Sequence, residues 1–216
     1  MSLITNIIHE EFSILVANKD NGTGLDGVDQ FEKLFLNDDK NIIIAGLGSD
    51  FEKSQEFAKI SNPKHALEFV NDYVNNHSNI LELCDASNPN KILHPQQLLL
   101  SFYDETMRKF CSYSATYSNI EVRKDLKGSI PNQLVYSCIG NEFQQINTLF
   151  QLPGIQQALQ SFNIMNFGLK EIDQLIKITS EIYDVIHLFN YHQKLEETFF
   201  VANNTAKIFE VYPNSF

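Results

Sequence analysis

The sequence predicts an α+β protein, a four-layer αββα sandwich in which two mainly antiparallel sheets lie between helical layers. Two observations predict this class. Along the 216 residues, the expected strands and helices come in blocks and not in strict βαβ alternation, which favours antiparallel sheets covered by helices. Several expected strands are also almost continuously apolar, which fits sheets that are covered on both faces. We expect a single domain over residues 1–216, because chains of this length rarely divide into two.

The first block contains four expected strands. Leu3–Ile8 and Phe12–Ala17 are rich in apolar and β-branched residues and flank a short polar segment, which is the pattern of a hairpin. Lys33–Asn37 and Asn41–Leu47 form a second expected hairpin around a polar turn. Between the two hairpins, residues 18–30 are polar and glycine-rich and therefore predict a loop.

Two helices and a second block of strands are expected next. The helices are predicted at about 49–60 and about 64–76, the second with its apolar residues at helical spacing. Residues 78–94 show no clear pattern, and a loop is expected over 85–91. The expected strands of the second block are 97–103, 108–114, 119–122 and 133–139.

The last part of the chain predicts helices followed by two short strands. A helical stretch begins near Glu142 and is interrupted around Pro153, which cannot continue a helix that precedes it. Leu169–Asn190 carries the longest apolar stripe at helical spacing and predicts the clearest helix. The two closing strands, separated by an asparagine turn, are expected at 198–202 and 206–212.

The chain is acidic, with a formal net charge of −11 and a pI of about 4.9. Such a surface would repel a phosphate backbone, so a nucleic-acid partner is not expected. No apolar run approaches the roughly 18–20 residues that span a bilayer, so a membrane partner is not expected either.

Cysteine and histidine usage bounds the compartment and the metal chemistry. Cys84, Cys111 and Cys138 are odd in number and widely spaced, unlike a disulfide framework, and the first residues lack the basic region of a secretory signal. We therefore expect a cytoplasmic protein, with Cys111 and Cys138 as buried thiols. His187 and His192 are five residues apart and would not share a helix face, so no metal site is expected and solvated or core-edge histidines are predicted.

One segment resembles a known family. Lys33-Leu34-Phe35-Leu36 is followed by a polar turn and by Ile-Ile-Ile-Ala-Gly-Leu-Gly-Ser-Asp over residues 42–50, downstream of the apolar run 12–17 and of Ser2. This order resembles the front end of proteasome-type N-terminal-nucleophile (Ntn) hydrolases, in particular proteasome β subunits. The motif covers roughly residues 2–52, and the predicted topology extends the resemblance over the whole chain.

The resemblance implies three catalytic residues. Ser2, exposed when Met1 is removed, would be the nucleophile, with its own α-amino group as the base. Lys33 would lower the pKa of the nucleophile's surroundings by its charge, and the Gly46 N–H would contribute to the oxyanion hole. The residues also allow another interpretation, in which Lys33 is an ordinary lysine at the start of a strand and Gly46 serves close packing. No cofactor is expected, because the Gly46-x-Gly48 pair lacks the third glycine of a dinucleotide fingerprint.

Three departures from the family pattern leave two functions open. Asn18 replaces the family's acidic residue, Ile139 stands where a serine is usual, and residues 193–198 contain no glycine pair. The first function is hydrolysis of peptide or other amide bonds with Ser2 as nucleophile. The second is a non-catalytic, degenerate subunit with a structural or interaction role. For either one, the family implies a homo-oligomer.

Overall fold

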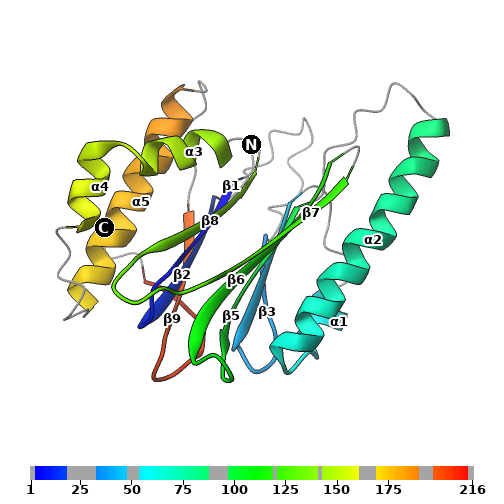
Figure 1. The fold of residues 1–216 in the computed structure, drawn as a ribbon, viewed down its shortest axis with the longest axis horizontal. Coiled ribbons are helices and arrows are strands. Elements are labelled where there is room, and N and C mark those ends of the chain that lie inside the picture. The colour runs from blue at the N-terminus through cyan, green and yellow to red at the C-terminus, as the bar shows by residue number, and fades with distance from the viewer. Residues whose placement is uncertain are drawn as a thin grey trace.

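The computed structural model describes residues 3–18, 33–47, 54–87, 97–118, 121–140, 143–160, 169–189 and 197–213 (Figure 1). Its strands form two five-stranded sheets, and every strand pair in them is antiparallel. Helices accompany both sheets, so the protein belongs to the α+β class that the sequence predicts. Among the described residues, no helix is both long and apolar enough to cross a membrane.

The first sheet has the strand order β10-β9-β2-β1-β8. Its strands are β1 (Leu3–Ile8), β2 (Phe12–Asn18), β8 (Val135–Gly140), β9 (Glu197–Asn203) and β10 (Glu210–Val211). The predicted hairpin of the first two strands is confirmed, with Ile4 opposite Ala17. Strand β1 is an inner strand of the sheet, between β2 and the edge strand β8, so its residues from Leu3 onward are held by a neighbour on each side.

The second sheet has the strand order β3-β4-β5-β6-β7. Its strands are β3 (Leu34–Leu36), β4 (Ile42–Leu47), β5 (Gln97–Asp104), β6 (Lys109–Ser118) and β7 (Glu121–Gly128). Successive strands are neighbours, so the sheet is a meander that α1 (Ser54–Ala58) and α2 (Pro63–Ser87) interrupt between β4 and β5. The predicted second hairpin is confirmed by the pairing of Leu34 with Ala45.

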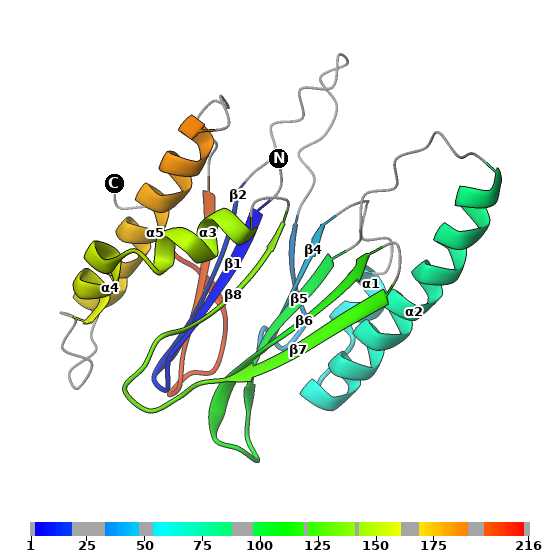
Figure 2. The same cartoon turned by 45° about the horizontal axis from the view of Figure 1, so that its top comes forward.

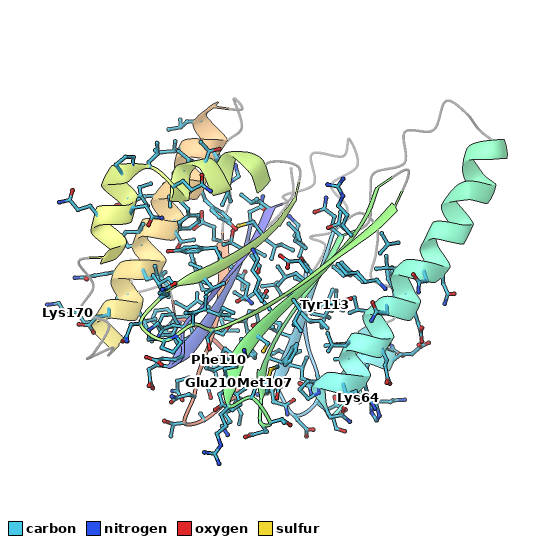
Figure 3. All side chains as sticks on the ribbon, in the orientation of Figure 1. Lys64, Met107, Phe110, Tyr113, Lys170 and Glu210 are labelled. Carbon is cyan, nitrogen blue, oxygen red and sulfur yellow. The ribbon has the colours of Figure 1, made fainter. Side chains whose placement is uncertain are left out.

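Helices pack on one face of each sheet (Figure 2). The remaining helices are α3 (Phe143–Phe150), α4 (Pro153–Gln160) and α5 (Leu169–Phe189). One buried cluster joins the first sheet to α3 and α5, for example through Ile7, Ile146 and Leu175. Another joins the second sheet to α1 and α2, where the Tyr113 hydroxyl donates to Asn71 of α2 at 2.7 Å (Figure 3).

A third buried cluster consists of side chains from both sheets and from the segment before β10. It contains Ile4 and Leu15 from the first sheet, and Leu99 and Phe110 from the second. Side chains alternate between the two faces of a strand, so Ile4 faces the other sheet while Leu3 and Ile7 face the helices. Because both faces of strands such as β1 and β2 are buried, their sequences are nearly continuous runs of apolar residues.

Several predicted boundaries were wrong. The strand predicted at 108–114, for example, continues to Ser118. The helix predicted at 64–76 continues to Ser87, including residues 85–87 of the predicted loop, because good helix formers such as Leu81 and Leu83 prolong it after the apolar stripe fades. The strand predicted at 119–122 extends to Gly128. The prediction stopped short because a charged strand at a sheet edge shows no alternation of apolar and polar residues. The strand predicted at 206–212 is reduced to Glu210–Val211.

The shortened last strand has a local cause. The Asn203 side-chain oxygen accepts the N–H groups of Thr205 and Ala206, at 3.1 and 2.7 Å, and so caps a turn. Lys207 then adopts a φ of 55°, which no strand residue has. The chain therefore regains an extended conformation only after this turn.

The buried side chains correct one more prediction. His187, predicted to be solvated or at the core edge, has 1% of its surface exposed. It lies one helical turn after the fully buried Tyr183, so both belong to the stripe of α5 that faces the sheet. Cys111 is buried, as predicted, and Cys138 is partly buried. His192, the other histidine of that prediction, lies outside the described residues.

Candidate active site

The described residues of the predicted site lie near the start of β1. The predicted nucleophile, Ser2, lies outside the described residues, whereas the next residue, Leu3, is the first residue of β1. Leu3 is fully buried and lies opposite Gly140 of β8. Its N–H donates to the side-chain oxygen Oδ1 of Asn18, at the end of β2, at 2.7 Å. The backbone that leads directly from Ser2 is therefore fixed on both sides.

Lys33 lies at the same place. It directly precedes β3, and only 8% of its surface is exposed. Its ammonium nitrogen donates to the main-chain oxygen of Asn18 at 2.8 Å and to Asn18 Oδ1 at 3.2 Å. Asn18 Oδ1 thus accepts from both Leu3 N and Lys33 Nζ. The structure brings the predicted lysine to the first residues of β1, although the two are about thirty positions apart in the sequence.

Asn18 supplies neutral oxygens to a buried cation. A buried ammonium is costly unless hydrogen bonds and charges compensate for its lost hydration. The two Asn18 oxygens provide hydrogen bonds, but a carboxamide carries no formal charge and does not exchange a proton with the lysine near neutral pH. Asn18 therefore contributes hydrogen-bond acceptors, but no charge, to the surroundings of Lys33.

The Gly46 N–H already has an acceptor. It donates to the main-chain oxygen of Lys33 at 3.0 Å, which continues the β3–β4 pairing by one residue. On its other side, Gly46 pairs with Leu98 of β5. To stabilise an oxyanion, this N–H would have to turn away from the Lys33 carbonyl. The oxyanion role of Gly46 stays a prediction, and it would require a local change at the end of β4.

A second hydrogen bond between the sheets was missed by the sequence analysis. The Gln97 side-chain oxygen accepts the Gly140 N–H at 2.8 Å and so joins β5 to β8. Gly140 has a φ of 132°, a conformation that L-residues with a side chain rarely adopt. One signal was available: Gln97 is a polar residue that opens an otherwise apolar strand, and it is 8% exposed.

Ile139, which stands where the resembled family usually has a serine, is a buried apolar residue at this end of the sheet. It lies opposite Ile4 of β1, is 2% exposed and belongs to the cluster between the sheets. A serine here could donate a hydrogen bond toward the chain start, but an isoleucine contributes only packing. The third departure, over residues 193–198, falls mostly outside the described residues.

Taken together, the described residues at this end offer one ammonium group, two amide side chains and a glycine with a positive φ. Among the described residues, no group of three or more histidine, cysteine, aspartate or glutamate side chains could hold a metal ion. Such a set can orient a backbone and impose a positive charge on it. No protein-family model and no curated protein matched the sequence.

Proposed function

We propose that this chain is a proteasome-type Ntn hydrolase that cleaves peptide or other amide bonds, with Ser2 as its nucleophile. The observation that carries the proposal is the shared acceptor: Asn18 Oδ1 binds both Leu3 N and Lys33 Nζ. A buried ammonium beside the residue that follows Ser2 is what an N-terminal nucleophile needs in order to become reactive at neutral pH.

The arrangement of sheets and helices supports the same family. In a four-layer αββα sandwich, two antiparallel sheets face each other and each carries helices on its outer face. The three buried clusters, two between a sheet and helices and one between the sheets, are compatible with this finer arrangement. Fold alone does not establish activity, so the proposal depends on the site.

In the proposed mechanism, Ser2 supplies both the nucleophile and the general base. After removal of Met1, the free α-amine would accept the Ser2 hydroxyl proton while the hydroxyl oxygen attacks the substrate carbonyl. The resulting oxyanion would be stabilised by backbone N–H groups. As it collapses, the C–N bond of the substrate would break, the α-ammonium would give its proton to the leaving nitrogen, and an ester would remain on Ser2. Water would then hydrolyse that ester and regenerate the free serine. Lys33 would act by its charge throughout.

A specific observation favours the second candidate, a non-catalytic subunit of the same fold. The Gly46 N–H is bound to the Lys33 carbonyl, and Asn18 gives Lys33 no balancing charge. A protein that retained the sandwich but lost hydrolysis would tolerate both features. In that case, Lys33 and Asn18 only hold the start of β1 against β3.

The two candidates are separated by the intact mass of the purified protein and by its amide hydrolysis. We expect Met1 to be absent, and fluorogenic peptide amides to be cleaved by the wild type but not by Ser2→Ala. Lys33→Met should lower the rate by at least about a hundredfold, the scale of one electrostatic catalytic group. Ser61→Ala and Lys59→Met, at exposed positions, are the matched controls. Retained Met1, or hydrolysis that Ser2→Ala leaves unchanged, would exclude this mechanism.

A further inference from the structure

Strand β7 is the outer strand of the second sheet (Figure 2). It pairs with β6 from Glu121 to Gly128, and no other described strand pairs with it. The four residues from 123 to 126 are all exposed, and Leu126 has 51% of its surface exposed. An unpaired strand edge of this length offers its backbone groups to another strand.

The direction of these backbone groups follows from one hydrogen bond. The Ser129 N–H donates to the Phe110 carbonyl at 2.8 Å, one step beyond the paired residues Cys111 and Gly128. In an antiparallel ladder, hydrogen-bonded and non-hydrogen-bonded pairs alternate along the strand. Residues 127, 125 and 123 therefore bond to β6. The N–H and C=O groups of Val122, Lys124 and Leu126 point to the free edge.

The β7 sequence is complementary to an antiparallel copy of itself. When two copies are centred on Lys124, Val122 of one lies opposite Leu126 of the other, and Arg123 lies opposite Asp125. This register also pairs the outward-pointing residues 122, 124 and 126 with one another, so each such pair can exchange both of its N–H···O bonds. The opposite charges fall in the non-hydrogen-bonded pairs, where side chains come closest.

Neighbouring registers do not have this property. Centring the pair on Asp125 would place Arg123 opposite Lys127, and centring it on Arg123 would place Glu121 opposite Asp125, so both would bring like charges together. Sliding one strand along the other by a single residue would instead place outward-pointing backbone groups opposite residues whose backbone groups point toward β6. The matching of charge, apolar contact and backbone direction in a single register points to a specific partner.

We propose that β7 pairs with β7 of a second copy of this chain, antiparallel and two-fold symmetric about Lys124. The two second sheets would then join into one continuous sheet, with the exposed Leu126 covered by the partner's Val122. This is an isologous interface, in which the same patch serves both subunits. It does not depend on the proposed hydrolysis.

A charged edge strand can also serve only to prevent edge-to-edge aggregation. That interpretation accounts for the exposed Arg123 and Lys124 but not for the opposite-charge match across the two-fold axis. Lys124, which would face its own copy, opposes dimerisation, and a seam of one strand from each copy is small beside the roughly 1,200 Å² of a stable interface. The dimer should therefore be weak, with a dissociation constant of about 10 μM to 1 mM.

Analytical ultracentrifugation of the full chain from about 5 μM to about 1 mM, a range chosen to bracket that affinity, tests the proposal. We expect reversible dimerisation, together with slower amide exchange at residues 122, 124 and 126 as the concentration rises. Lys124→Thr should strengthen the dimer several-fold by removing the like-charge pair, whereas the exposed control Lys59→Thr should not.

Two further variants address the register. Lys124→Pro removes an outward N–H that β6 does not use, so it should abolish dimerisation while leaving the fold intact. Asp125→Arg should weaken the dimer at least tenfold, and adding Arg123→Asp in the same chain should restore it, because the opposite charges are exchanged. A chain that stays monomeric up to about 1 mM, or a dimer unchanged by Lys124→Pro and Asp125→Arg, would overturn the proposal.

Discussion

The ammonium of Lys33 donates to Asn18 at two points, the main-chain oxygen at 2.8 Å and the side-chain oxygen Oδ1 at 3.2 Å. The same side-chain oxygen holds the Leu3 N–H at 2.7 Å. The end of β2, the start of β3 and the start of β1 therefore depend on one carboxamide. Changing it should affect stability and reactivity together.

Asn18→Asp should stabilise the protein at neutral pH and, if the protein is a hydrolase, increase its rate. A carboxylate would keep both acceptor positions and add an ion pair to a buried lysine, about 1–3 kcal/mol in the free energy of unfolding. The gain should be present above the unfolded aspartate pKa of about 3.9 and disappear as the pH falls through the lower folded value. Urea unfolding at pH 7 and pH 3 measures it. Asn18→Ala, which removes the side-chain acceptor, should instead destabilise.

Gln97→Met should lower the free energy of unfolding by about 1–3 kcal/mol. The substitution keeps the side-chain volume but leaves the buried Gly140 N–H without the acceptor that Gln97 Oε1 provides at 2.8 Å. Gln97→Glu retains an acceptor oxygen and should recover most of the loss at a pH low enough to keep its carboxyl group protonated, since a buried carboxylate carries a desolvation cost of its own. Chemical denaturation of the three proteins checks this. Equal stability of the Met and Glu variants would show that the hydrogen bond between the sheets contributes little.

The stability of the protein should decrease as the pH falls below about 6.5, the ordinary histidine pKa, through His9. Burial lowers the His9 pKa, and this effect outweighs the opposing charges of Glu10 and Glu11. Its Nδ1 accepts the Glu11 N–H at 3.2 Å, which requires an unprotonated Nδ1. The unfolded chain binds the proton more readily than the folded one. The contribution of His9 to the free energy of unfolding is therefore fully present above the unfolded pKa and is lost as the pH falls from that value to the lower folded pKa.

Unfolding free energies measured in urea between pH 7.5 and pH 5.5 test this dependence. His9→Gln should flatten the profile over that interval, while His65→Gln, at an exposed position on α2, should leave it unchanged. A wild-type stability that is constant over the whole interval would contradict the assignment to His9.

Ser101→Ala and Ser112→Ala should have opposite outcomes, although the two serines face each other across β5 and β6. The Ser101 and Ser13 hydroxyls form a hydrogen bond of 2.7 Å between the sheets, so losing it should cost about 1 kcal/mol. The buried Ser112 hydroxyl has no hydrogen-bond partner among the described residues, so its removal should be neutral or stabilising. Thermal unfolding of both variants compares them, and a larger loss for Ser112→Ala would refute this reasoning.

Much of the fold could be predicted from residue patterns, and the failures share a physical cause. Leu3–Ile8 was predicted with its observed bounds, because a strand buried on both faces is apolar at most positions, here at Leu3, Ile4, Ile7 and Ile8. Strand β7 was predicted too short, because an edge strand at the surface needs no apolar residues. The sequence therefore reports burial well, and it reports backbone pairing only where burial accompanies it.

The candidate site was predicted less completely. Lys33 could be found because the residues around it resemble a family motif, and the structure brings it to the first residues of β1. Gln97 could not be found in this way, because its function depends on Gly140, which is 43 positions away and belongs to the other sheet. Contacts between sheets follow from stacking, which local sequence patterns do not encode.

Polar links fasten the two sheets to each other at both ends. Lys33 binds Asn18 at one end, while at the other the Phe209 N–H donates to the Lys40 carbonyl at 2.7 Å. Sliding one sheet over the other by a single residue would break both links at once. A group carried at the start of β1 is therefore placed relative to the second sheet by hydrogen bonds at both ends of the stack and not by one contact alone.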